Sequence, residues 1–571
     1  MESLRLLARM EGLDPELASG DLQFARLTAD ESDVGAVSKA TTAGEAQPDP
    51  FGARGITLRV VAAGILVALL FGVAFFCLLR VCPDIPGGDD GYRHVKMASR
   101  LIRAPHATFA NPWHLVYFWP KPVDPWFGYH VLLAPFTLFL DLTVAAKAMA
   151  SVVFAGFALA LLLLLKQMRV RHRLIWVALA LCGSSVALHR AALTRPFQFS
   201  VVLVLFATLY TLRNKPLAVG ITAAVHAFSY SIFFLVAFAP VINLVLRRDR
   251  EAVKILCASM AGMATGLLCS PYFPENLRFG IVQAYAPFLI VSQHIPISTE
   301  LDALNVWWIV ASLPVAVVWI ASLVRWVRTR SSLEAKPGTS LLLAMSVLSL
   351  AASVRTSRTF DYFVPVAVLS SAALLADWTV KRRNARQLAL VLAPLCALTV
   401  TATVIRLKGE PSAARFRGVA QYLLEHDRGA VVANRWDQYA RLFFWNAENT
   451  YVTGVAPEFM FLRDPGKYWL WRHITDDESR TCAQWKCSSG DARDVVETVA
   501  RDLNAGYVVT EHDRSPRLEA LLRGSPRARE VYRDGACSLF AIRAAWSAAA
   551  AGSLRIQRSW PWQPVAKLAA Q

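Results

Sequence analysis

The stretch Ile56–Leu79 reads ITLRVVAAGILVALLFGVAFFCLL and carries a single charged residue, Arg59. A helix that crosses the hydrocarbon core of a bilayer needs about 20 mostly apolar residues, so this stretch predicts a membrane span. The runs between 199 and 246 are short, and two of them can also be read as one long helix with a broken middle. Further apolar runs bring the total to about eleven spans: residues 143–165, 174–188, 199–212, 217–229, 230–246, 253–269, 306–324, 338–354, 362–379 and 388–406.

The composition of the 571 residues agrees with this interpretation. Apolar residues make up 55% of the chain and charged residues 18%, below the quarter or so that is typical of soluble domains. These values exclude a disordered chain and a simple soluble enzyme. They also exclude a basic nucleic-acid module, because the net charge of +18 is carried by short segments between apolar runs. The predicted fold class is a polytopic α-helical membrane protein with a small C-terminal α/β extracytoplasmic domain.

Lysine and arginine are distributed unevenly among the short loops, and cation-rich loops of multispan proteins face the cytoplasm. The cation-rich loops are therefore predicted to be cytoplasmic, together with the N-terminus. An odd number of spans then places the C-terminal region outside, in a multi-pass protein of the inner (cytoplasmic) membrane. The loops concerned are residues 166–173, 213–215, 247–254, 325–336 and 381–386.

Four segments follow from local composition. Residues 1–55 are polar, lack a signal-peptide pattern and are predicted to be a loosely ordered cytoplasmic tail. Residues 56–406 hold the spans, with a long outer loop at 80–142. Residues 407–545 alternate strand-like and helix-like runs, which indicates an α/β domain on the outer face, and residues 546–571 form an unassigned tail. The strand-like runs are 430–433, 507–510 and 538–542, and the helix-like runs are 413–426 and 492–504.

Two cysteines of the outer domain, Cys482 and Cys487, are separated by four residues. In an oxidising compartment this spacing predicts a local disulfide. A metal site is the alternative, and it is less favoured because no histidine follows at ligand spacing.

The outer loop opens with an acidic pair in the segment GGDDGYRH, residues 87–94. Adjacent carboxylates at a membrane surface need water, a cation or a reacting proton, which makes Asp89 and Asp90 candidate catalytic residues. They can equally be a turn and helix N-cap in a solvated loop. Residues 92–103 predict an amphipathic helix that can lie in the interface, with an apolar stripe and with Arg93 among its cations.

The rest of this loop is rich in aromatic residues, proline and histidine between 111 and 130. Aromatic side chains at this depth are normally interface anchors. That explanation does not cover Lys121, Asp124 and His130. Aromatic walls with a few polar groups also describe a pocket for a sugar or a polyprenyl phosphate.

Few cations lie in the other outer loops, and those present are candidates for binding an anion. Arg195 is in the second outer loop, and Arg355 and Arg358 stand at i, i+3, where they would face one way on a helix. Snorkelling to lipid phosphate is the alternative role. His226 lies in an apolar stretch, which favours a packed or hydrogen-bonded histidine over a catalytic one.

These motifs, in this order and on this side of the membrane, resemble the GT-C superfamily of multispan glycosyltransferases, which use polyprenyl-phosphate-linked sugars. The superfamily includes protein O-mannosyltransferases, the aminoarabinose transferases of lipid A and the catalytic subunit of oligosaccharyltransferase. Its pattern is one helix, then a long outer loop that opens with an acidic pair, a tyrosine and an amphipathic helix, as at residues 89–103. The His/Pro-rich element at 125–135 and the Arg–Tyr–Pro element at 358–365 continue the resemblance.

The sequence also departs from that pattern. Asp90 stands where glutamate is usual, and residues 194–198 of the second outer loop carry no carboxylate. The metal-dependent oligosaccharyltransferase branch has an acidic residue there. Its Trp-Trp-Asp motif is also absent from the C-terminal region of this sequence, so the resemblance favours branches that transfer a monosaccharide.

The resemblance and the chemistry of an inverting transfer together assign roles. Asp89 is the predicted base, Asp90 its partner or a metal ligand, and His130 a group that orients substrate. The phosphate of the donor would be held by arginine or lysine. A divalent cation, Mg or Mn, would need more oxygen ligands than the pair supplies. The predicted phosphate-binding residues are Arg355, Arg358, Lys121 and Arg195, and those predicted to line the substrate are Tyr92, His94, Trp126, His226 and Tyr362.

The predicted partners are a polyprenyl-phosphate sugar donor, the lipid bilayer and a glycan, lipid or protein acceptor, with no nucleic acid. Two alternatives remain. A lipid or saccharide transporter or flippase would show internal repeats and charges within its spans, whereas this sequence shows no twofold repeat in hydropathy and its spans are nearly free of charge. A non-catalytic membrane assembly subunit would tolerate loss of Asp89.

Overall fold

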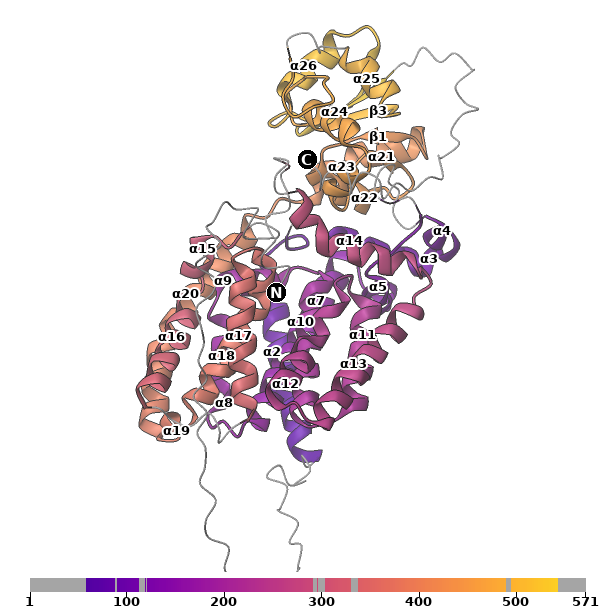
Figure 1. Ribbon diagram of the computed structural model, residues 1–571. Coiled ribbons are helices and arrows are strands. Elements are labelled where there is room, and N and C mark those ends of the chain that lie inside the picture. Colours follow the sequence, from indigo (N-terminus) through magenta and orange to yellow (C-terminus); the bar gives the residue numbers. More distant parts are fainter. Residues whose placement is uncertain are drawn as a thin grey trace, which may run out of the picture. The chain divides into compact units, whose positions relative to one another are not determined.

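The computed structural model describes residues 58–87, 90–111, 119, 121–290, 295, 303–329, 337–488 and 494–542 (Figure 1). Every described residue belongs to one compact unit, which begins at Leu58. Both predicted tails and Asp89 lie outside the described residues.

Each apolar run predicted from the sequence coincides with a helix or with two consecutive helices. Among the described residues, four helices are long and apolar enough to cross a membrane, or five if the bent pair α8–α9 is one span. The predicted count of eleven is therefore not established, although several other helices are apolar but shorter. The helices are α2 (Leu58–Leu79), α7 (Leu142–Gln167), α8 (Arg173–Cys182), α9 (Ser185–Ala192), α10 (Pro196–Leu212), α11 (Pro216–Ser229), α12 (Phe238–Arg247), α13 (Arg250–Leu268), α14 (Glu275–Ile290), α15 (Val306–Val310), α16 (Leu313–Thr329), α17 (Pro337–Ser353), α18 (Phe360–Leu374), α19 (Ala376–Thr379) and α20 (Arg382–Lys408).

Small residues set the closest helix packing in the bundle, between α11 and α13, which run side by side in Figure 1. A Cβ added to Gly262 would lie 2.0 Å from the carbonyl oxygen of Gly220, and one added to Gly266 would lie 2.2 Å from that of Ala224. The two backbones therefore touch, which only glycine permits. This is the usual basis of helix association in membranes, where lipid supplies no hydrophobic force between helices.

The predicted amphipathic helix of the outer loop is present as α3 (Asp90–Arg103), followed by α4 (Pro105–Ala110), α5 (Phe127–Leu133) and α6 (Phe136–Phe139). The predicted position of this helix in the membrane interface was wrong for its first turns. Residues 91–95 and 97–99 are buried, including Arg93, because α3 packs against α5 and α7 on one side and α22 of the C-terminal region on another. The helix is therefore a packed element with a charged N-terminus, not a helix floating in the interface.

Residues 413–542 contain a five-stranded sheet covered by helices. The strand order is β2-β1-β3-β5-β4, with β2, β1 and β3 parallel and β5 antiparallel to both β3 and β4. The predicted strands are present as β1 (Val431–Ala433), β3 (Tyr507–Glu511) and β5 (Cys537–Ile542). The other elements are α21 (Arg417–His426), α22 (Tyr439–Trp445), β2 (Thr450–Tyr451), α23 (Pro457–Arg463), α24 (Pro465–Thr475), α25 (Val495–Arg501), α26 (Pro516–Gly524) and β4 (Ala528–Arg533).

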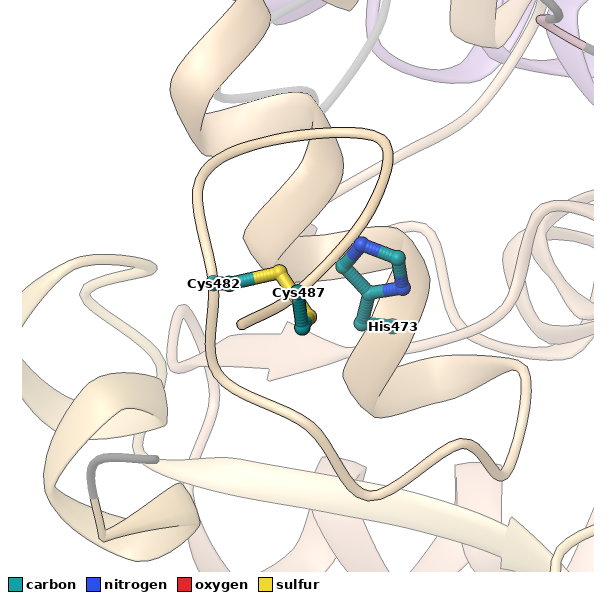
Figure 2. A group of neighbouring side chains, drawn as sticks. All are labelled: His473, Cys482 and Cys487. Carbon is teal, nitrogen blue, oxygen red and sulfur yellow. A yellow bond between two sulfur atoms is a disulfide. The ribbon is translucent and has the colours of Figure 1, made fainter. Parts of the chain in front are cut away.

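Cys482 and Cys487 form a disulfide, with their Cα atoms 5.5 Å apart. Figure 2 shows the ring of His473 beside the disulfide. One candidate ligand atom from each of the three residues lies within 4.8 Å of the other two. The histidine precedes the cysteines in the sequence, so spacing after them does not reveal it. Its Nδ1 meets Glu478 Oε2 at 2.7 Å and its Nε2 meets the Gln484 carbonyl oxygen at 2.8 Å. Both ring nitrogens of His473 are hydrogen-bonded, and both sulfur atoms are joined in the disulfide. The cluster is therefore a structural cross-link.

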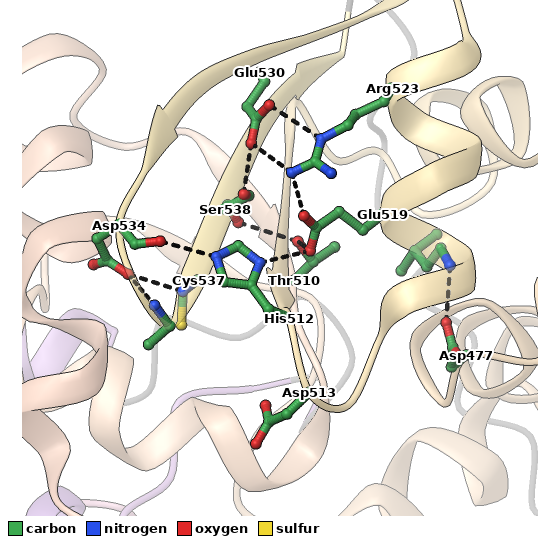
Figure 3. Close-up of polar contacts among 12 residues, drawn as sticks. Asp477, Thr510, His512, Asp513, Glu519, Arg523, Glu530, Asp534, Cys537 and Ser538 are labelled. Carbon is green, nitrogen blue, oxygen red and sulfur yellow. Dashed lines mark hydrogen bonds and ion pairs between the residues drawn. The ribbon is translucent and has the colours of Figure 1, made fainter.

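A polar network joins the C-terminal end of β3 to α26 and to the turn between β4 and β5 (Figure 3). His512 Nδ1 lies 2.8 Å from Glu519 Oε2, and Nε2 lies 2.9 Å from the Asp534 carbonyl oxygen. Both partners are acceptors, so the doubly protonated ring satisfies both. The hydrogen bonds to Glu519 and Asp534 accordingly raise the pKa of His512 above its usual value.

This raised pKa predicts a small pH dependence of stability. A histidine whose folded-state pKa is raised stabilises the fold fully below its unfolded pKa of about 6.5. That contribution is lost as pH rises through the higher folded value. We expect the purified protein to melt at a lower temperature at pH 8.5 than at pH 6, and His512→Gln to reduce the difference. The control is His426→Gln, because His426 is exposed and its ring hydrogen-bonds a backbone carbonyl and not a carboxylate. An unchanged difference in His512→Gln would refute the assignment.

Candidate active site

Two arginines hold the carboxylate of Asp90 where α3 begins. Arg93 NH2 lies 2.7 Å from Asp90 Oδ1, and Arg195 Nε lies 3.2 Å from Asp90 Oδ2. Arg93 comes from the first turn of α3, whereas Arg195 is the residue that precedes α10. The side chain of Asp90 keeps 28% of its surface exposed while Arg93 keeps 3%. The predicted acidic residue is thus fixed in position and still accessible to a substrate.

Arg93 is itself held from behind. Its guanidinium carbon lies 5.0 Å from the centre of the Trp126 ring, a cation–π distance, and its NH2 lies 3.4 Å from His94 Nε2. The predicted substrate-lining residues Trp126 and His94 therefore pack beneath Arg93 in this structure, and both are buried.

A buried chain of hydrogen bonds continues from His94. Its Nδ1 is 2.7 Å from His130 Nε2, and His130 Nδ1 is 2.6 Å from Asp124 Oδ2. Asp124 Oδ1 also accepts from the backbone N–H of Trp126 at 3.1 Å. Because Asp124 can only accept as a carboxylate and Arg93 can only donate, each ring carries its proton on Nδ1. Burial, aided by the charge of Arg93, lowers the pKa of His94 and keeps that ring neutral.

This chain gives His130 a definite role. The sequence predicted that it orients substrate, but the ring is fully buried between His94 and Asp124. Its hydrogen bond to His94 links it to Arg93, and Arg93 in turn pairs with Asp90. Sequence alone offered no way to pair the two histidines, which lie on different helices.

Asp124→Asn should loosen this arrangement. An amide supplies only one acceptor oxygen, so either the His130 N–H or the Trp126 N–H loses its partner, at a cost of about 1–3 kcal/mol in unfolding free energy. We also expect reduced turnover, since Arg93 loses its fixed support. Denaturation and turnover assays of the purified variant check both effects, with Asp141→Asn as control, because Asp141 is exposed before α7 and its side chain does not cap that helix. Unchanged stability and turnover would contradict the proposed support.

Arg358 and a glutamate that sequence reasoning missed belong to the same neighbourhood. Arg358 lies in the 3-10 turn Ser357–Thr359, and Arg355 lies in the turn before it, so the two are not on one regular helix as predicted. Glu458, in the first turn of α23, is 5% exposed. The charges of Arg358 and Asp90 both act on its carboxyl group. A glutamate in a soluble-looking segment gives no sequence signal of this placement.

The remaining predicted residues have other contacts. Lys121 Nζ pairs with Glu275 Oε1 at 3.3 Å, and its side chain is 64% exposed. The hydroxyl of Tyr92 accepts from the backbone N–H of Ala413 at 3.3 Å, which ties α3 to the C-terminal domain.

His226 and Tyr362 meet within the helical bundle. The hydroxyl of Ser200 lies 2.6 Å from His226 Nε2 and 2.7 Å from the Tyr362 hydroxyl. His226 is thus a hydrogen-bonded core histidine, the first of the two roles considered for it.

The residues described around Asp90 do not fit a divalent cation. Two guanidinium groups occupy the carboxylate, and a divalent cation prefers several oxygen ligands. Among the described residues, a cluster of three candidate metal ligands lies in another part of the fold. Its members are His473, Cys482 and Cys487. The predicted contribution of Asp89 to a Mg or Mn site falls outside the described residues.

No sequence-family profile matches the chain, and no curated protein matches it. Solved structures do. The apo oligosaccharyltransferase of Archaeoglobus fulgidus matches with a TM-score of 0.54 at 13% identity, over 86% of this chain and 75% of that one. Apo ArnT from Cupriavidus metallidurans matches at 0.51 and 14%, over 84% and 97%. The arabinofuranosyltransferase AftD from Mycobacteria matches at 0.52 and 15%, over 85% of this chain and 42% of that one.

All three are glycosyltransferases of the GT-C type. The chain therefore has the GT-C fold, as its motifs predicted. The match reaches the C-terminal domain as well as the helices, since it covers more than four-fifths of the chain.

Proposed function

We propose that this protein is a membrane glycosyltransferase that moves a sugar from a polyprenyl-phosphate-linked donor to an acceptor on the outer face of the membrane, with inversion. The observation that carries the proposal is the acidic residue Asp90, fixed between Arg93 and Arg195 where α3 begins in a GT-C fold. Buried support for a half-exposed carboxylate is typical of a site that must hold one geometry during reaction.

Asp89 is the proposed base. Its carboxylate takes the proton of the acceptor as the acceptor attacks the anomeric carbon, and Asp90 beside it is held still by its two arginines. Arg358 and Arg195 bind the phosphate of the donor, because the planar guanidinium pairs two phosphate oxygens. They also stabilise the negative charge that develops on the departing lipid phosphate.

The proposed setting is the inner membrane, with the N-terminus in the cytoplasm and the C-terminal domain outside. The acceptor is a glycan, a lipid or a protein. The oligosaccharyltransferase structure with a tethered acceptor peptide, which matches over 80% of this chain at a TM-score of 0.51, supports an acceptor site in this fold.

Turnover by purified protein in lipid nanodiscs tests the proposal. The protein is given a panel of polyprenyl-phosphate-linked pentoses and hexoses together with envelope glycans and lipids, and release of free polyprenyl phosphate is measured. We expect release that requires both donor and acceptor and is lost in Asp90→Asn. Movement of intact donor across a sealed vesicle without cleavage would support the flippase alternative instead.

Arg358→Ala should weaken donor capture more than it slows chemistry. A charge-assisted hydrogen bond to phosphate contributes about 1.5–3 kcal/mol, so KM for the donor should rise roughly 10–150-fold. The matched control is Arg501→Ala, because Arg501 is an exposed arginine paired only with Glu497. An unchanged KM in Arg358→Ala would remove Arg358 from the phosphate site.

A further inference from the structure

We propose that Glu458, contributed by the C-terminal domain, is the acid of this active site, which gives a proton to the lipid phosphate as it leaves the sugar. The inference rests on the proposed transferase function and adds to it a catalytic residue. It also gives the outer domain a direct part in the reaction.

The first observation is the burial of an unsatisfied carboxyl. Glu458 is 5% exposed, and its Oε2 has no hydrogen-bond partner among the described residues. A buried polar atom without a partner costs free energy. A cost of this kind is commonly retained at sites where a ligand completes the hydrogen bonding.

The second observation is a continuous set of side-chain contacts from α23 to the acidic residue. Phe459, next to Glu458, lies 4.8 Å from Phe279 between ring centres, and Phe279 lies 6.1 Å from Trp126. Trp126 is the ring over which Arg93 sits, and Arg93 binds Asp90. This packing fixes the position of α23 relative to Asp90. Glu458 therefore does not lie on a loosely attached domain.

The third observation is electrostatic. The groups that act on the Glu458 carboxyl are Arg358 and Asp90, and Tyr468 of α24 feels its charge in turn. Burial raises the pKa of Glu458 to about 7, with Asp90 acting in the same direction and Arg358 opposing. Asp90, in contrast, is paired with two guanidinium groups. Two carboxyl groups in such different environments are typical of a site in which one carboxyl group keeps its proton while the other is ionised.

The reaction then balances. The acceptor atom forms a bond to the anomeric carbon and its proton goes to the base at the acidic pair. The bond between the anomeric carbon and the phosphate oxygen breaks, and its electron pair stays on the phosphate. Glu458 donates its proton to that phosphate while Arg358 holds it. Water afterwards returns a proton to Glu458 and removes one from the base.

A binding experiment tests this without knowledge of the sugar or the acceptor. The probe is decaprenyl phosphate, titrated into the full-length protein in nanodiscs at pH 6 and pH 8.5. If only the protonated carboxyl binds phosphate, a pKa of about 7 leaves the wild type about 30-fold weaker at pH 8.5. Glu458→Gln keeps the shape and an N–H donor but cannot titrate, so it should show only the pH dependence of the phosphate itself.

The controls separate the failure of this inference from that of the proposed function. Glu425→Gln replaces an exposed glutamate of α21 and should behave as wild type. Glu458→Asp keeps an ionisable carboxyl and should retain the pH dependence if the Gln variant fails to fold. Equal pH dependence in wild type and Glu458→Gln would overturn the inference alone. No binding by wild type would overturn the proposed function as well.

Discussion

Replacing Asp89 by asparagine is expected to reduce turnover by roughly 10²–10⁴-fold, the usual worth of general-base help. An amide has nearly the shape of a carboxylate but cannot take the acceptor's proton. Folding and membrane insertion should be unaffected, because the change is isosteric and removes one charge from an outer loop. Turnover of purified protein in nanodiscs is the measurement.

Asp90→Asn distinguishes which member of the pair is the base. It removes the charge that pairs with Arg93 and Arg195, and we expect a loss of turnover with some disturbance of the site. Asp89→Asn at the parental rate with Asp90→Asn inactive would move the base to Asp90. If both variants stayed fully active, the assembly-subunit or transport interpretation would replace the catalytic one.

Arg190→Met is expected to be the most destabilising of the single changes considered. Arg190 Nε lies 2.9 and 2.8 Å from the two carboxylate oxygens of Asp361, and both side chains are less than a tenth exposed. The guanidinium also stacks on Phe197 at 4.4 Å. Removing it leaves a buried carboxylate without its partner, which costs about 3–5 kcal/mol.

Unfolding by titration with a denaturing detergent measures this cost. The double variant Arg190→Met with Asp361→Leu should recover much of the loss, because replacing a buried ion pair by apolar groups is often close to neutral. The exposed pair Arg247–Asp249 supplies the control, since Arg247→Met should cost at most about 1 kcal/mol. A single variant as stable as the parent would show that the pair contributes little.

The fold was largely predictable because its signals are local. Apolar runs of span length mark the helices whatever their partners are, and the alternation around Tyr507–Glu511 marks a central strand. The bend between α8 and α9, at 77°, was not predictable, because it depends on Ser184, which caps α9 and bonds Ser312 in the distant turn before α16. Strand β4 was missed because three of its six residues, Arg529, Glu530 and Arg533, are charged, which hides the strand pattern.

Only those residues of the site that belong to a recognisable sequence motif could be predicted. Asp90 and Arg195 could be proposed from sequence because an acidic pair and outer arginines are unusual in themselves. Contacts between segments far apart in the chain pair His94 with His130. Such contacts also bring Glu458 near Arg358 and Asp90. The amphipathic pattern of α3 also could not show that Arg93 is buried, since periodicity shows which residues share a face but not which other segments cover that face.

The central claim is that lipid phosphate binds at the outer site formed by Asp90, Arg195, Arg358 and Glu458. A structure of the wild-type protein determined with decaprenyl phosphate in nanodiscs tests it most directly. We expect phosphate density within hydrogen-bonding distance, about 3 Å, of the Arg358 or Arg195 guanidinium, with Glu458 Oε2 facing it. Phosphate density elsewhere, with these three side chains unchanged and apart from it, would contradict the account.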